Sequence, residues 1–109
     1  MSKKLDPVFG EKILPKNSNW SFAFSVLKKT TVRIRGLSES PIALSVMTAE
    51  QVDRFCEGYC VPGIGSPMYR PRHLLEIELN PGKYEVLLIN PNKKSSSLIM
   101  YSVTENKSS

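Results

Sequence analysis

Apolar residues that recur at every second position are the feature that most constrains how this chain can fold. Residues 20–26 place Trp, Phe, Phe and Val at alternate positions, and residues 30–35 repeat the alternation with Thr, Val and Ile. A period of two is typical of an extended strand with one buried face. A helix would instead need apolar residues three and four positions apart. The chain is therefore expected to consist mainly of half-buried strands.

Further strands are predicted over residues 42–47, 73–79, 84–89 and 98–103. Lys28 and Lys29 are expected to form a turn, so that the strands on either side of them pair as a hairpin that ends at Gly36. Residues 37–41 are predicted to be a loop. Residues 59–72 contain three prolines and two glycines, and we expect them to be irregular.

The alternation is interrupted after the third strand. Thr48 and Gln51 have the spacing of a capping box, in which each side chain accepts a hydrogen bond from the other residue's backbone amide at a helix start. Because Gly58 supplies a stop, one short helix is predicted over residues 48–58. The predicted core draws on all of the strands: Trp20, Phe22, Phe24, Ile34, Leu44, Val46, Ile77, Leu79, Val86, Leu88 and Met100.

Six to eight short antiparallel strands and one helix predict an all-β protein with the architecture of a β-sandwich. The 109 residues suffice for one domain with one core. We divide the chain into an amino-terminal arm or edge strand over residues 1–18, a sandwich domain over residues 19–104 and a flexible tail over residues 105–109.

The order of these elements resembles that of a known group of modules. The segment MTAEQVDRFCEG is followed by LEIELNPGKYEVLLIN, in which Pro81, Gly82 and Tyr84 form a P-G-x-Y turn before a strand. From Trp20 to Val103 the chain is similar to the small jelly-roll-like β-sandwich modules of the GOLD and bacterial pre-peptidase C-terminal kind. The resemblance implies a jelly-roll-like sandwich with a non-catalytic role in binding protein, cargo or polysaccharide.

Two features of the chain differ from that group. Its members usually occur in secreted or lumenal proteins, whereas the amino terminus here has no apolar signal region, which predicts a cytoplasmic location. Some members bind calcium through clustered carboxylates, but Asp6 and Asp53 are far apart and no D-x-D motif occurs. A calcium site is therefore not expected. A transmembrane segment is not expected either, because no apolar run approaches the roughly 20 residues that span a bilayer.

The net charge of +5 suggests an anionic partner. Most lysines lie at predicted turns or near the amino terminus, where they keep strand edges soluble. A compact cationic group requires the fold to bring two pairs of arginines together: Arg33, Arg35, Arg70 and Arg72. If it does, the alternative function is an anion-binding module for nucleic acid or acidic lipid, with a steep dependence on salt.

Cysteine chemistry has few residues to draw on. Cys56 and Cys60 are the only cysteines, and their C-x3-C spacing differs from the two- or four-residue spacing that is usual in zinc sites. His73 would be a third ligand, but a fourth is lacking. Reduced structural thiols are the preferred interpretation, a local disulfide the second and a metal site the third. We therefore expect neither a metal nor a cofactor.

No catalytic residues are predicted. A nucleophilic thiolate would need a cysteine beside the histidine, with an acid to orient the imidazole. Glu76 and Glu78 share one face of a strand, as paired catalytic carboxylates would, but the solvent face of an amphipathic strand explains them better. They would form cross-strand pairs with Arg33 and Arg35 if those strands are neighbours.

The irregular segment and the arm are the predicted contact regions. Tyr, Met and Arg are enriched at protein interfaces, and prolines reduce the entropy lost on binding. The apolar residues of the arm suit it to add a strand to a neighbouring sheet. We therefore predict a non-enzymatic protein-interaction or assembly module that binds a protein partner or a second copy of itself. The predicted partner-binding residues are Tyr59, Met68, Tyr69, Arg70, Arg72, Phe9 and Ile13.

Overall fold

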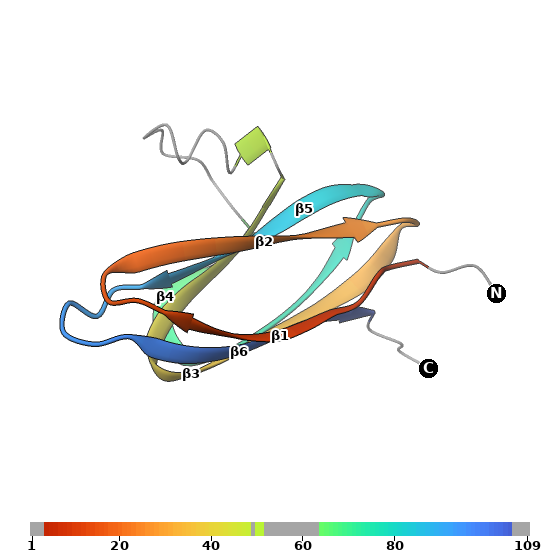
Figure 1. Ribbon diagram of the computed structural model, residues 1–109. Coiled ribbons are helices and arrows are strands. Elements are labelled where there is room, and N and C mark those ends of the chain that lie inside the picture. The colour runs from red at the N-terminus through yellow and green to blue at the C-terminus, as the bar shows by residue number, and fades with distance from the viewer. Residues whose placement is uncertain (1–3, 49, 52–63, 106–109) are drawn as a thin grey trace.

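The computed structural model describes residues 4–48, 50–51 and 64–105, the last range with side chains from Tyr69 onward. These residues form six strands, and every pairing between them is antiparallel. Figure 1 shows the strands as one curled sheet, which confirms the prediction of an all-β antiparallel fold. The strands are β1 (Val8–Leu14), β2 (Ser18–Val26), β3 (Thr30–Thr48), β4 (Ile64–Leu79), β5 (Gly82–Asn90) and β6 (Ser97–Glu105).

Strand pairing is nested about the middle of the chain. β1 pairs with β6, β2 with β5 and β3 with β4, so the chain folds back on itself as in a jelly roll. β3 also pairs with β6 through residues 32–38 and with β5 through residues 43–48. The sheet therefore curls into two layers that share β3 and β4. The first layer contains β1, β6 and the first half of β3; the second contains β2, β5 and the second half of β3.

The predicted hairpin at Lys28 and Lys29 is wrong. Within the described residues, β2 pairs with β5 and not with β3, so this connection carries the chain from the second layer to the first. Alternation shows which side chains of a strand are buried. It does not show which strand lies alongside, and this is the reason for the error.

The first half of β3 does not end where predicted. The strand continues through Gly36 and through the predicted loop at residues 37–41, so both of these predictions are wrong. Its ladder with β4 loses register between Leu37 and Ile42. Irregularities of this kind bend a strand and release some residues from pairing. Pro41, which has no amide hydrogen, can therefore occur within β3.

The prediction of irregular chain over residues 59–72 is wrong from Ile64 onward, where β4 begins; residues 59–63 lie outside the described part. β4 runs through Pro67 and Pro71. Among the described strands it pairs with β3 alone. Amides on the free side of an edge strand need no partner in the ladder, so prolines can occur there.

The predicted capping box is present after β3. The backbone N–H of Thr48 donates to Gln51 Oε1 at 2.9 Å, and the backbone N–H of Gln51 donates to Thr48 Oγ1 at 3.2 Å. Glu50 and Gln51 have helical backbone. The rest of the predicted helix, residues 52–58, lies outside the described residues.

The core lies between the two layers. All of the predicted core residues except Met100 belong to it or pack against it. Met100 is 45% exposed, whereas Ile99 and Val103 are fully buried, so the prediction for Met100 is wrong. Residues 98–101 are all apolar, and alternation could not show which of them face inward.

The side chain of Tyr101, a residue with a glycine opposite it on each neighbouring strand, joins the layers. Gly10 and Gly36 are the Cα partners of Tyr101 on its two sides. The Tyr101 ring stacks on Phe22 of the second layer, with 4.4 Å between ring centroids. A Cβ added at Gly10 would overlap the Tyr101 ring. Gly10 therefore makes room for the contact between the layers.

We expect Gly10→Ala to lower the free energy of unfolding by about 1–3 kcal/mol, the usual cost of overpacking. In a Tyr101→Ala background the same substitution should cost nothing, because the clash is gone and alanine loses less backbone entropy than glycine. Urea unfolding of the four proteins measures both values. Equal costs in the two backgrounds would contradict this account of Gly10.

Candidate interaction surface

The outer face of the first layer carries several exposed apolar side chains. Core residues alternate with outward-facing residues along each strand: Ile99 is fully buried, whereas Leu98 and Met100 are 36% and 45% exposed. Residues opposite one another in an antiparallel ladder share a face, so the ladders gather the exposed apolar residues of four strands. We call this set the outer apolar face: Phe9, Ile13, Leu37, Leu74, Leu98 and Met100.

Two hollows lie in this face. The larger has a volume of about 540 Å³, and we call it the arginine groove; its lining residues are Arg35, Leu37, Arg70, Arg72, His73 and Leu74. The smaller, of about 230 Å³, is lined by Leu37, Ser38, Glu39, Leu98 and Met100. Because Leu37 lines both, the two hollows are adjacent parts of one surface.

The fold brings three of the four predicted anion-binding arginines together. Arg35, Arg70 and Arg72 line the arginine groove. Arg33 lies one row further along β3 and forms an ion pair with Glu76, with 3.3 Å between Nη2 and Oε1. Arg33 and Glu76 are Cα partners in the ladder of β3 and β4, which confirms the cross-strand pair that was expected if the strands were neighbours.

The second carboxylate of this strand also has a cationic partner. Glu78 Oε1 lies 3.3 Å from Lys29 Nζ, and both side chains are more than 60% exposed. Such exposed pairs contribute about 0–1 kcal/mol to stability. The carboxylates of β4 thus face the solvent side of the sheet in ion pairs.

His73 is part of the wall of the groove. Its side chain is buried, and its Nε2 lies 2.7 Å from the carbonyl oxygen of Ile42, to which it donates a hydrogen bond. This contact spans the point where the ladder of β3 and β4 loses register. His73 therefore holds the two strands together where backbone pairing is interrupted. The two cysteines that might have accompanied it lie outside the described residues.

The predicted partner-binding residues do not form one site, because they lie on β1, in the arginine groove and in a separate pocket. Phe9 and Ile13 are 69% and 65% exposed on β1, the edge strand that pairs with β6 of its own sheet. Arg70 and Arg72 line the groove, whereas Tyr69 lines a different pocket. The position of Tyr59 and the side chain of Met68 lie outside the described part.

Sequence reasoning missed Leu37, Leu74, Leu98 and Met100. Leu98 and Met100 flank the buried Ile99, and Leu74 precedes Leu75, which packs against the core. A signal was present, because an apolar residue at a position that alternation assigns to solvent is unexplained by the core.

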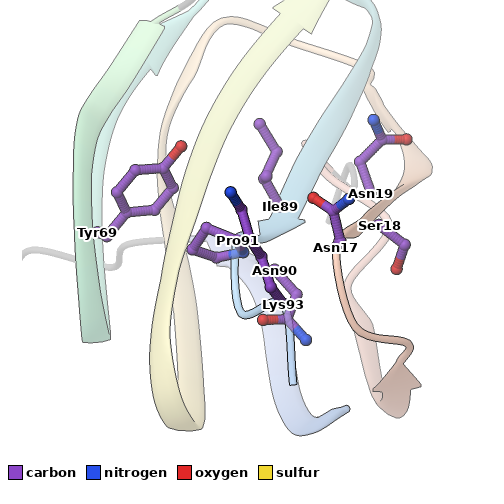
Figure 2. Close-up of a pocket in the computed structure, with 8 residues that line it drawn as sticks. All are labelled: Asn17, Ser18, Asn19, Tyr69, Ile89, Asn90, Pro91 and Lys93. Carbon is purple, nitrogen blue, oxygen red and sulfur yellow. The ribbon is translucent and has the colours of Figure 1, made fainter. Parts of the chain in front are cut away.

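Figure 2 shows the separate pocket that Tyr69 lines, beside the connection from β1 to β2 and the connection from β5 to β6. It has a volume of about 300 Å³ and is lined by Asn17, Ser18, Asn19, Tyr69, Ile89, Asn90, Pro91 and Lys93. Asn90 is fully buried. Its Nδ2 lies 3.1–3.3 Å from three backbone carbonyl oxygens, and its Oδ1 accepts from the backbone N–H of Asn92 at 3.0 Å. The carbonyls belong to Leu14, Pro15 and Ser95.

The side-chain amide of Asn90 therefore makes its hydrogen bonds within the protein. It ties together the connections β1–β2 and β5–β6, which also share a hydrogen bond from the backbone N–H of Asn17 to the carbonyl of Asn92 at 2.8 Å. A buried amide with this many partners is costly to remove. We assign it to the packing of the connections and not to binding.

Comparison with solved structures shows the same fold in a bacterial protein. The crystal structure of the pre-peptidase C-terminal domain of a collagenase from Bacillus anthracis superposes with a TM-score of 0.60, over 90% of this chain and 88% of that one. The sequences are 12% identical, so the similarity shows the fold alone. It confirms, for the fold, the predicted resemblance to pre-peptidase C-terminal modules. No family model and no curated protein matches the sequence.

The described residues contain neither a metal-binding cluster nor a membrane-spanning helix. No group of three or more His, Cys, Asp or Glu side chains in residues 4–48, 50–51 and 64–105 is arranged to hold a metal ion. In the same part of the chain, no helix has the length and apolar character that crossing a membrane requires.

We expect Asn90→Ala to lower the free energy of unfolding by about 2–3 kcal/mol, because it leaves buried carbonyl groups without a donor. Asn19→Ala is the matched control, since Asn19 lines the same pocket but is exposed, and it should change stability by less than about 0.5 kcal/mol. Urea unfolding compares the two. Similar costs for both would contradict the structural role of Asn90.

Proposed function

We propose that this chain is a non-enzymatic protein-interaction module that binds through the outer apolar face. The observation that carries the proposal is the gathering of six large, exposed apolar side chains on one face of the sheet. Contiguous apolar patches on a protein surface usually mark interaction sites. The core is complete without these residues, so folding does not account for them.

The composition and rigidity of the face support a protein partner. Arginine, methionine and aromatic side chains are enriched at interfaces, whereas lysine is depleted. The described lining of the groove contains three arginines and no lysine. The face is built on paired strands. A surface of this kind loses little entropy on binding, because its backbone is already ordered.

Two observations support a non-enzymatic role. The carboxylates of Glu76 and Glu78 are in ion pairs with Arg33 and Lys29. The similar solved structure is one domain of a larger protein, a collagenase, which is consistent with a module that serves in binding. The second candidate function, anion binding, is favoured by the grouping of Arg35, Arg70 and Arg72, but it leaves the apolar residues unexplained.

Photocrosslinking tests the proposal. We expect p-benzoylphenylalanine at position 100, in the chain expressed in its native cells, to form a specific protein adduct or a crosslinked dimer. The same group at position 27 is the control, because Leu27 is similarly exposed, at 48% against 45%, but lies in the connection between β2 and β3. It should give no adduct of the same mass.

A second substitution makes the test specific to the face. Leu98→Lys should remove the adduct formed at position 100, because it places a charge in the hollow that Leu98 and Met100 share. No adduct at position 100, the same adduct at position 27, or an adduct that Leu98→Lys leaves unchanged would contradict the proposal.

A further inference from the structure

We infer that the arginine groove binds an acidic peptide segment of the protein partner, with carboxylates on Arg35 and Arg72 and apolar side chains against Leu37 and Leu74. The inference rests on the proposed function, because the groove is part of the outer apolar face. It adds the chemistry of the segment that is recognised and the residues that recognise it.

The four side chains form a checkerboard. Arg35 is the Cα partner of Leu74, and Leu37 is the Cα partner of Arg72. The arginines therefore occupy one diagonal and the leucines the other. Diagonal neighbours in an antiparallel ladder are about 7–8 Å apart, and alternate residues of an extended peptide are about 7 Å apart. Two carboxylates separated by one residue thus match the two guanidinium groups.

The charges of the groove favour an anionic occupant. Among the residues that the structure describes, the lining contains no carboxylate, and neither Arg35 nor Arg72 has a carboxylate within ion-pair distance. The nearby acids of β4 are already neutralised by Arg33 and Lys29. Guanidinium groups pair with carboxylates and phosphates through two parallel charge-assisted hydrogen bonds, which are stronger than neutral ones.

The apolar half of the groove favours a peptide over a nucleic acid. Leu37 and Leu74 are 41% and 58% exposed. Within the described part of the chain, no aromatic side chain on which a base could stack lines the groove. A peptide segment offers carboxylates and an apolar side chain together. The exposed leucines therefore favour an acidic peptide over a nucleic acid as the bound anion.

Contacts of His73 and Gly36 fix the shape of the arginine groove. His73 donates to the carbonyl oxygen of Ile42, and Gly36 lies below it, with an added Cβ 3.9 Å from the Cβ of His73 and 3.0 Å from Leu44 Cδ1. These contacts lock β4 against β3 at the irregular part of the ladder. The arginines therefore project from a surface that need not rearrange on binding.

An NMR titration tests the inference with a defined probe. The peptide SESESLS, acetylated and amidated, should shift the amide signals of residues 35–37 and 72–74, whereas SQSQSLS at the same concentration should not. Arg35→Gln with Arg72→Gln should raise the Kd at least tenfold. Lys16→Gln with Lys94→Gln removes the same charge at exposed positions elsewhere and should change the Kd less than twofold.

Leu74→Ser separates a peptide site from a general anion site. It should raise the Kd of SESESLS at least threefold and leave the spectrum that of a folded protein. Equal weakening by the arginine and lysine double variants would overturn the inference in favour of general charge attraction. Tighter binding of a ten-residue oligothymidylate, unaffected by Leu74→Ser, would overturn it in favour of nucleic acid.

The two proposals fail separately. If SESESLS does not bind while the adduct at position 100 still forms, the acidic segment is wrong and the interaction face stands. If the adduct also fails to form, both are wrong.

Discussion

One bent strand, β3, carries the hydrogen bonding on which the rest of the fold depends. It pairs with β4, β5 and β6, and no other strand of the described part pairs with more than two others. Because its first half lies in one layer and its second half in the other, the two layers are one sheet. The bend falls between Leu37 and Ile42, where the ladder with β4 loses register. The core between the layers can close only because the strand turns there.

The same bend creates the candidate surface. Where backbone pairing is interrupted, His73 bonds to the carbonyl of Ile42, and the side chains of Arg70 and Arg72 come to line one groove with Arg35. An irregularity in a sheet commonly re-aims side chains in this way. The constraint that closes the core thus also sets the positions of the guanidinium groups, so fold and proposed function share one physical origin.

The sequence predicted the composition of the strands better than their arrangement. Alternation identified Phe24, Ile34 and Leu88 as core, because burial of one strand face is a local property. It misplaced Met100 and ended the second predicted strand at Gly36, because bends, bulges and the choice of neighbouring strand depend on residues distant in the chain. The sequence predicts a compact arginine group only if the fold brings the two pairs of arginines together. The register of β3 with β4 does so for three of the four. The apolar half of the groove was missed because Leu37 fell in a predicted loop and Leu74 beside a core position.

The most direct test asks whether the outer apolar face serves binding and not folding. The measurement is the free energy of unfolding of a Leu74→Thr and Met100→Thr double variant, compared with Ile34→Thr in the core. The account predicts a change of less than about 1 kcal/mol for the double variant, as for surface positions. Ile34→Thr should cost several times more, about 2–5 kcal/mol, as large losses from a packed core do. A cost above about 3 kcal/mol for the double variant would show that these side chains support the fold, and would contradict the central claim.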